Sequence, residues 1–356
     1  MRNIAIIIVF VGCIGTTYCQ TVTGTVYDQS NNSLLSDAAV YINGTSIGTI
    51  SDIDGHFILN VSNYSSLPIT ISLLGYYSTT LSDYHSNKTY KIYLSPKTTV
   101  LNEIILTGKN KNWKKYFKIF KKEFLGQTKN AMACKILNED ALRFSFDPKN
   151  KTLEAFALQP IIIHNNSLAY TITYYLDKFK YKREEEEKPG YIENYRRKSE
   201  VSENLIILGN YLFKDELLTL SEPEQKKVED RRRSAYLGSR MHFFRLLHHG
   251  NLLQKGKHSV LLTDFTLSSN AYIIRSDKTI DSDSLVCCKD AVSGYFKKSG
   301  EFSVQYQGNK TKITVKKDSV QFQRNGYFDP IEILFDGAMS KQRIGDLLPF
   351  EYALKQ

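Results

Sequence analysis

No apolar run in the sequence is long enough to cross a membrane, cysteine is scarce, and tryptophan occurs once. A membrane-spanning helix needs about 20 consecutive apolar residues, so we expect no transmembrane helix in the mature chain. One Trp beside 23 Tyr and 19 Phe tilts the composition toward β-structure. Hydrophobic residues fill 42% of the 356 positions and charged residues 24%, which is typical of a globular chain with room for two domains.

The first residues have the pattern of an export signal. A basic start precedes an apolar run at residues 4–11, and small residues at positions −3 and −1 precede Gln20. This pattern predicts a secretory signal peptide over residues 1–19, and therefore a location in the periplasm, at the outer membrane or on the cell surface. The alternative is lipidation at Cys13, because the four residues that end there loosely resemble a lipoprotein cleavage box.

The cysteines do not form a disulfide framework. Cleavage before Gln20 leaves three of the five, Cys134, Cys287 and Cys288, and an odd number cannot all be paired. One bridge from Cys134 to either of the others and three buried free thiols are equally compatible with the sequence. Metal binding by the adjacent pair is not expected, since no suitably spaced ligands lie near it.

Charge is distributed unevenly along the chain. Residues 20–108 hold three lysines against six carboxylates, a net charge of −3. The whole chain carries +10, and Arg2 is the only charged residue before position 20, so residues 109–356 carry +12. A basic region beside an acidic one indicates an anionic partner. In an exported protein we expect an anionic lipid, an acidic glycan or another envelope protein, and not nucleic acid.

Residues 20–108 alternate between apolar and polar in short runs that are separated by turns. Phe57, Leu59 and Val61 point one way while their neighbours point the other, and several similar runs follow one another at short intervals. This spacing predicts a β-sandwich of about seven strands. A polar linker at residues 109–112 then marks the domain boundary.

A basic aromatic segment opens the second region. Its aromatic residues recur at helical spacing and predict one apolar face of a helix over residues 113–124 that ends at Gly126. Lysines fill the rest of the helix: Lys114, Lys115, Lys118, Lys121 and Lys122. Either the helix rests on an anionic membrane, or its aromatic face is buried in the domain and its lysines are solvated. The second alternative is favoured, and the lysines remain our candidate face for an anionic partner.

A longer helix is predicted further along. Ser221 and Glu224 form a capping box, and the helix should run to about Leu247 with a kink at Gly238. The three arginines at residues 231–233 fit a solvated helix face better than an anion site. The surrounding sequence is strand-rich. The expected fold is therefore mainly β: a sandwich, then a basic α+β domain with an amphipathic first helix and one longer helix.

Patterns that suggest catalysis have simpler explanations. Residues 44–48 match the Gly-x-Ser-x-Gly pattern of serine hydrolases, but they lie between two short strands, so we expect a hairpin. Residues 52–55 resemble a calcium loop without its closing Glu, so we expect a turn. No His is followed by Glu three positions later, and no His-Glu-x-x-His occurs. His242 and His249 could share a helix face, but a metal would need a third ligand; His248 and His249 suit a helix C-terminus. We therefore expect no catalytic site, cofactor or metal.

Residues 21–108 resemble the carboxypeptidase regulatory-like family. The resemblance is carried by residues 23–26, 38–42, 48–49, 52–57 and 73–76. It implies a transthyretin-like (prealbumin-like) β-sandwich that is not itself catalytic. The same module precedes TonB-dependent outer-membrane receptors, and residues 101–108 are similar to the segment that follows it there. However, 248 residues remain after Gly108, too few for a plug and a 22-stranded barrel.

The second half is similar to the C-terminal region of exported proteins that carry this domain. Residues 120–126, 134–138, 170–176, 233–239 and 346–352 carry that resemblance. It implies an envelope protein without an assigned activity. We therefore expect a non-enzymatic envelope or surface protein, with an interaction or spacer sandwich and a basic binding domain. The alternatives are an uncharacterised hydrolase with its site in residues 109–356, or an accessory of a TonB-dependent uptake system.

Overall fold

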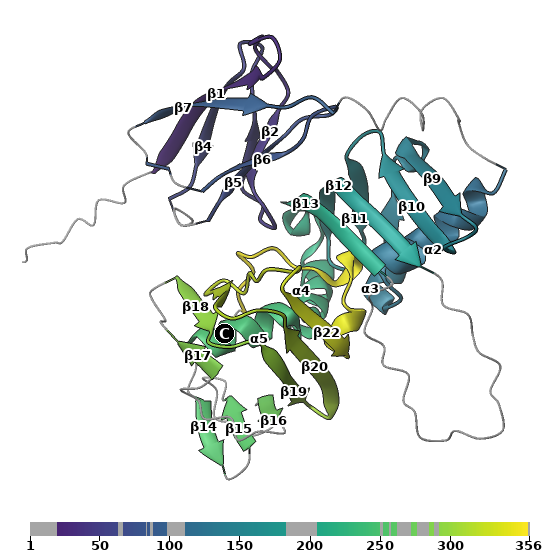
Figure 1. Cartoon of the computed structure of the whole chain (residues 1–356). Coiled ribbons are helices and arrows are strands. Elements are labelled where there is room, and N and C mark those ends of the chain that lie inside the picture. The colour runs from purple at the N-terminus through teal and green to yellow at the C-terminus, as the bar shows by residue number, and fades with distance from the viewer. Residues whose placement is uncertain are drawn as a thin grey trace, which may run out of the picture.

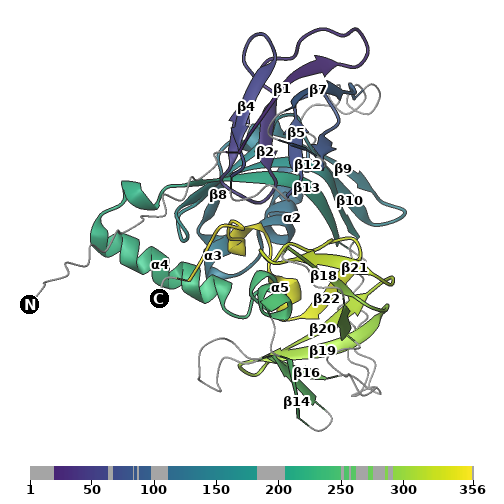
Figure 2. The same cartoon turned by 90° about the vertical axis from the view of Figure 1, so that its left-hand side faces the viewer.

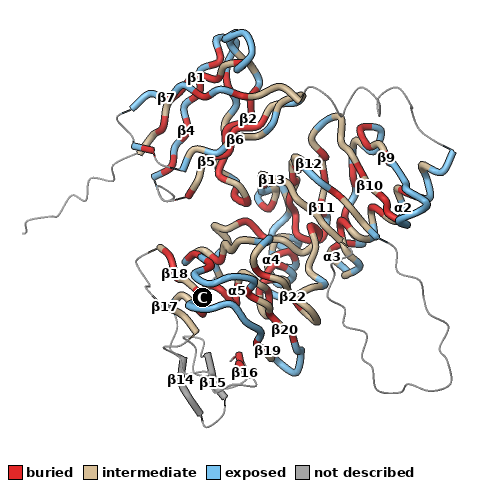
Figure 3. The backbone as a smooth tube through the Cα atoms, in the orientation of Figure 1, coloured by how far each residue is buried: buried red, intermediate tan, exposed pale blue. Residues whose placement is uncertain are grey.

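The structure is a computed structural model, and Figure 1 shows its course. It describes residues 20–62, 67–82, 84–85, 88–97, 111–182, 205–249, 252–255, 258–261, 272–275, 285–287 and 292–354. The predicted signal peptide and the alternative lipidation at Cys13 lie outside the described residues. Buried side chains of the described residues gather in three large clusters. Figure 3 colours the buried positions red along the backbone.

The first cluster is the core of a seven-stranded β-sandwich, as predicted. One sheet has the order β4-β1-β7, from β1 (Thr21–Asp28), β4 (His56–Asn60) and β7 (Thr89–Leu94). The other has the order β3-β2-β5-β6, from β2 (Ala39–Ile42), β3 (Gly48–Ile50), β5 (Ile69–Ser72) and β6 (Thr79–Leu81). The strict alternation in β4 buries Phe57 and Leu59 between the sheets, while Ile58 faces solvent.

The second cluster lies under a six-stranded antiparallel sheet. Its strands are β8 (Cys134–Ile136), β9 (Leu142–Asp147), β10 (Thr152–Ala157), β11 (Ile161–Asn165), β12 (Tyr170–Lys182) and β13 (Leu205–Asp215). The long β12 pairs with β10 and β11 along one side and with β13 along the other. Two helices pack with this sheet, α2 (Trp113–Leu125) and the short α3 (Lys129–Met132) (Figure 2). The helix predicted over residues 113–124 is therefore confirmed.

The longer predicted helix is divided in two. Helix α4 (Glu222–Tyr236) begins as expected, with the Ser221 N–H donating to the Glu224 carboxylate at 3.1 Å. It ends before Gly238, which has φ +79°, and α5 (Arg240–His249) begins anew. A Cβ on Gly238 would lie 2.9 Å from the Tyr306 ring. The expected kink is thus a complete break, because Gly238 turns the chain while the Ser239 hydroxyl accepts the His242 N–H at 3.0 Å.

The third cluster surrounds α5. One sheet has the order β14-β15-β16-β19-β20-β22, with β14 (Leu252–Lys255), β15 (His258–Leu261), β16 (Tyr272–Arg275), β19 (Gly300–Tyr306), β20 (Asn309–Val315) and β22 (Ile333–Gly337). A smaller sheet contains β17 (Val286–Cys287), β18 (Ser293–Phe296) and β21 (Val320–Gln323). Short 3-10 turns complete the fold at Glu139–Ala141, Leu217–Thr219, Met339–Lys341 and Ile344–Asp346. The chain finally returns to the second cluster, where Ile344 and Leu348 are buried.

The sandwich is joined to the rest of the chain through the hairpin between β2 and β3. The Gly44 N–H donates to the Tyr211 carbonyl, and the Phe213 N–H donates to the Thr45 carbonyl, both at 2.8 Å. The Phe350 N–H donates to the Gly44 carbonyl at the same distance. Gly44 has φ +76°, and a Cβ there would lie 2.5 Å from the Phe350 ring, so this joint requires glycine. The hairpin thereby extends backbone bonding from the sandwich to β13.

Candidate functional site

The aromatic side of α2 is packed against the sheet. Phe120 and Phe124 stack with ring centroids 4.7 Å apart, and both are fully buried. Phe120 meets the edge of Phe179 at 4.8 Å, and Phe124 meets Tyr174 at 4.9 Å, both on β12. The Trp113 indole N–H donates to the Leu142 carbonyl at 3.1 Å. The apolar face that could have entered a membrane is therefore part of the core.

The lysine side of α2 faces the solvent. Four of its lysines are exposed and the fifth is half-buried: Lys114, Lys115, Lys118, Lys122 and, half-buried, Lys121. At about 100° per residue, all five lie within about 120° of the helix circumference. Among the described residues, the ion pair on this face joins Lys122 Nζ to Glu123 Oε1 at 3.6 Å. The predicted face is thus one continuous stripe of positive charge, and binding of an anion to it stays a prediction.

Of the three arginines at residues 231–233, Arg232 contradicts the expectation of a solvated face, while Arg231 and Arg233 are exposed. Arg232 is only 4% exposed, and its guanidinium lies 3.8 Å above the Tyr170 ring. Its Nε donates to the Leu168 carbonyl at 2.8 Å, and two further nitrogens grip the Asp215 carboxylate at 2.9 and 2.7 Å. The fork geometry of arginine fits this set of acceptors. The neighbouring Arg231 also bonds inward, to the Ser167 carbonyl at 2.6 Å. Arg232 therefore holds neighbouring segments together, and the exposed Arg231 adds one bond to the same region.

Two histidines of α5, His242 and His249, lie in different surroundings: the first is buried and the second is exposed. His242 is buried in an aromatic cluster, where its Nδ1 accepts the Gly238 N–H at 3.1 Å and lies 3.2 Å from the Tyr272 hydroxyl. Burial, assisted by the charge of Arg245, lowers the pKa of His242 to about 4, so the ring is neutral at pH 7. His249 is exposed and donates from Nδ1 to the Arg245 carbonyl at 2.8 Å, at the end of the helix.

The hydrolase-like and calcium-like patterns are local turns. Residues 44–48 form the β2–β3 hairpin, as predicted, and the exposed Ser46 bonds through its backbone N–H to the Glu351 carboxylate. Asp52 Oδ1 accepts the N–H groups of Asp54 and His56 at 3.0 and 2.8 Å, so this carboxylate closes a turn. In the part of the chain that the structure describes, no three His, Cys, Asp or Glu residues gather as a metal-binding group.

Cys134 is a free, buried thiol, so a bridge from this residue is contradicted. Its Sγ donates to the Asn130 carbonyl at 3.4 Å. Burial, together with the charge of Asp346, raises the pKa of Cys134 to about 12, so the thiol is protonated and unreactive at pH 7. The side chains of Cys287 and Cys288 lie outside the described residues.

Within the described ranges, no helix combines the length and the apolar character that crossing a membrane requires. Among the described helices, α2 and α4 carry exposed charged side chains.

Comparison with known proteins identifies the sandwich. Residues 22–106, about a quarter of the chain, match the family described as CarboxypepD_reg-like domain, which confirms the resemblance predicted for residues 21–108. No curated protein is significantly similar to the chain. The resemblance predicted for the second half stays a prediction.

One solved structure that is similar comes from Bacteroides fragilis and is described as that of a membrane-associated protein of unknown function. The two chains share 10% sequence identity, and the alignment covers 89% of this chain and 97% of the other. The TM-score is 0.17, which does not establish a common fold.

Proposed function

We propose that this chain, whose residues 22–106 form a CarboxypepD_reg-like domain, is a non-enzymatic cell-envelope protein that binds an anionic partner through the lysine face of α2. The proposal rests on the difference between the two sides of α2. One side is committed to the core through Phe120 and Phe124, and the other presents five lysines to solvent. A domain with a net charge of +12 adds a long-range attraction for the same partners.

Binding through this face would be electrostatic. The aromatic side is already packed, so the helix offers no apolar surface for insertion. A lysine close to an anionic membrane contributes about 1 kcal/mol, and salt at 0.1 M screens such contacts beyond about 10 Å. Lipid phosphates and the carboxylates of acidic glycans share the required chemistry, which is repeated negative charge at a surface. The sandwich, bonded to β13 through its hairpin, would act as a fixed interaction module.

A charge reversal with a matched control tests the proposal. The double variant Lys118→Glu with Lys122→Glu lowers the net charge of the five-lysine face from +5 to +1. Lys226→Glu with Lys227→Glu makes the same change of net charge on exposed positions of α4. Binding is measured by sedimentation with vesicles of phosphatidylcholine, with and without phosphatidylglycerol, and by calorimetry with polygalacturonate, at 50 and 300 mM salt.

We expect the α2 variant to lose at least about tenfold in affinity for one anionic probe, and the α4 variant to retain it. Loss with the vesicles alone identifies a lipid surface, and loss with polygalacturonate alone identifies an acidic glycan. Equal affinities for both variants, or binding that salt does not weaken, would show that the lysine face is not the binding site.

A further inference from the structure

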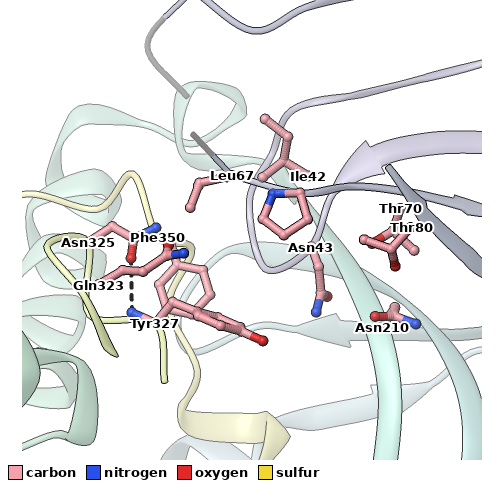
Figure 4. A pocket seen from close by; sticks show the side chains of 11 residues that line it. Ile42, Asn43, Leu67, Thr70, Thr80, Asn210, Gln323, Asn325, Tyr327 and Phe350 are labelled. Atoms are coloured by element: carbon pink, nitrogen blue, oxygen red, sulfur yellow. Dashed lines mark hydrogen bonds between the residues drawn. The ribbon is translucent and has the colours of Figure 1, made fainter. Parts of the chain in front are cut away.

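Strand β13 lies at an edge of the second sheet, since among the described strands it pairs with β12 alone. The sandwich hairpin bonds to this edge near Tyr211, whose N–H donates to Asn43 Oδ1 at 2.9 Å and whose carbonyl accepts the Gly44 N–H at 2.8 Å. Figure 4 shows Asn43 and Asn210 at the pocket that remains beside this joint, and its volume is about 100 Å³. The hairpin therefore occupies the edge from about residue 210 onward, and no further strand fits there.

The first half of β13 leaves the same edge open. In an antiparallel strand, successive residues turn their N–H and C=O groups to opposite sides. Tyr211 turns its groups away from β12, so Leu205, Ile207 and Gly209, which have the same parity, do so as well. Among the described residues, these three form no backbone bond on that side. The open edge thus consists of residues 205–209, and it continues directly from the part that the hairpin covers.

The sequence of this open edge lacks the features that usually protect one. Residues 205–209 are Leu-Ile-Ile-Leu-Gly, with no charged residue and no proline. Charged residues and proline are the common means by which natural sheets keep their edges from pairing with another chain. An apolar edge without them is a site of aggregation unless a regular partner covers it. We therefore expect this edge to have a regular partner.

The open edge is complementary to itself. Two copies placed antiparallel about Ile207 form three hydrogen-bonded pairs, with about six backbone bonds between the strands. In this register Ile207 lies opposite its own counterpart, and Ile206 lies opposite Leu208. The remaining pair joins Leu205 to Gly209. No like charges face each other, and directly opposed aliphatic side chains stabilise a sheet. A two-fold axis through Ile207 makes the interface closed, so that it ends at a dimer.

We infer that the open half of β13 is a dimer interface, at which two copies of this chain join their second sheets edge to edge. The occupant is a second copy, because the same five residues satisfy both sides of the pairing. The interface is short, since the hairpin limits it to residues 205–209, and each copy carries a net charge of +10. The result is a weak dimer, with a dissociation constant in the micromolar range, which salt strengthens by screening the repulsion between the copies.

Sedimentation velocity of the purified protein between 1 and 200 µM, at 50 and 500 mM salt, tests this inference. We expect the mass to rise with concentration from that of one chain to that of two and then to stop, and the association constant to increase severalfold at the higher salt. Binding of an anion to the lysine face of α2 responds to salt in the opposite direction, so the two proposals fail independently. A monomer at 200 µM, or a mass that continues to rise beyond two chains, would overturn the inference.

Two charge variants test the register. Leu205 and Ile207 pack against the second cluster, so Ile206 and Leu208, which alternate with them, lie on the other face and can be replaced without opening the core. Ile206→Lys and Leu208→Glu should each weaken the dimer at least about tenfold. Mixed in equal amounts, the two proteins should associate again, because the new lysine of one copy faces the new glutamate of the other.

A matched control separates the edge from net charge. Leu137 is 61% exposed and follows β8, the strand at the opposite edge of the sheet, so Leu137→Lys should leave the association unchanged. Circular dichroism of all three variants checks that they are folded. Equal association constants in Leu208→Glu and Leu137→Lys, or no recovery when Ile206→Lys and Leu208→Glu are mixed, would show that β13 is not the interface.

Discussion

Helices α2 and α4 both contain a dense run of basic residues, but the structure uses the two runs in opposite ways. On α2 the lysines lie on the solvent side, and the energy of packing comes from Phe120 and Phe124. On α4 the middle arginine, Arg232, is itself part of the interior and bonds to the ends of two neighbouring segments. A run of basic residues therefore says little about function until the acceptors around each side chain are known.

The chemistry of the two side chains explains the difference. A lysine ammonium is strongly hydrated and needs few fixed partners, so it remains in water when packing is supplied by its neighbours. A guanidinium is planar and presents several donors in fixed directions, so it can satisfy the Leu168 and Ala169 carbonyls together with the Asp215 carboxylate. For this reason α2 is a candidate binding surface, while α4 is a structural brace.

The largest effect is expected from the buried side of α2. Phe120→Ala should reduce the free energy of unfolding by about 4 kcal/mol, because it removes a fully buried ring from contacts with Phe124 and Phe179. Urea denaturation followed by circular dichroism measures this loss. Lys118→Ala, on the exposed side of the same helix, should change stability by less than about 0.5 kcal/mol. A comparable loss of unfolding free energy in the two variants would mean that α2 does not have one buried side and one exposed side.

The brace on α4 should come next. Arg232→Ala should lower stability by about 3 kcal/mol, since it removes the arginine donor from the buried Leu168 carbonyl and one of the two donors to the Ala169 carbonyl. The Asp215 side chain is 47% exposed and can be rehydrated, which keeps the loss below that of a fully buried pair. Arg233→Ala, one position along and exposed, is the matched control and should be close to neutral in the same denaturation experiment. The brace would be refuted by equal losses at the two positions.

The smallest of the three effects is the dependence of stability on pH. It involves His242 and so extends the comparison to α5. The folded pKa of His242, about 4, lies below the usual value of 6.5, so the unfolded chain binds the proton more tightly. Stability from this group is therefore fully present above pH 6.5 and falls as the pH is lowered toward 4, by at most about 3 kcal/mol.

Denaturation midpoints at pH 7, 5.5 and 4 measure this dependence, with His242→Gln against the exposed His249→Gln. We expect the dependence on pH to become shallower in His242→Gln only. An unchanged pH profile in that variant would assign the acid sensitivity to other groups.

The parts of the fold that depend on the spacing of apolar and polar residues within one segment could be predicted from the sequence. Strands β4 and β7 of the sandwich follow from alternation within each run, and the burial of Phe57 and Leu59 on β4 needs only the period of a strand. The aromatic stripe of α2 likewise predicted both its helix and its lysine face. In each case, residues a few positions apart contain the whole signal.

The features that were missed depend on distant contacts. Arg232 is buried by Leu168, Ala169 and Asp215, which are 17 to 64 positions away in the sequence. The Tyr306 ring leaves no room for a Cβ at position 238, but the helix break itself follows from the glycine turn and the Ser239 cap, a local sign that was missed. The pocket between the sandwich and the rest of the chain is lined by segments between Ile42 and Phe350, and no sequence window contains it.

The bond from the Phe350 N–H to the Gly44 carbonyl has a consequence for the order of assembly. A chain that emerges from its N-terminus presents the sandwich first, and local pairing allows that domain to fold early. Its joint with the rest, however, needs a strand near residue 211 and a segment near residue 350. We expect the sandwich to fold first and to dock onto the rest of the chain only after the segments near residues 211 and 350 have been synthesised.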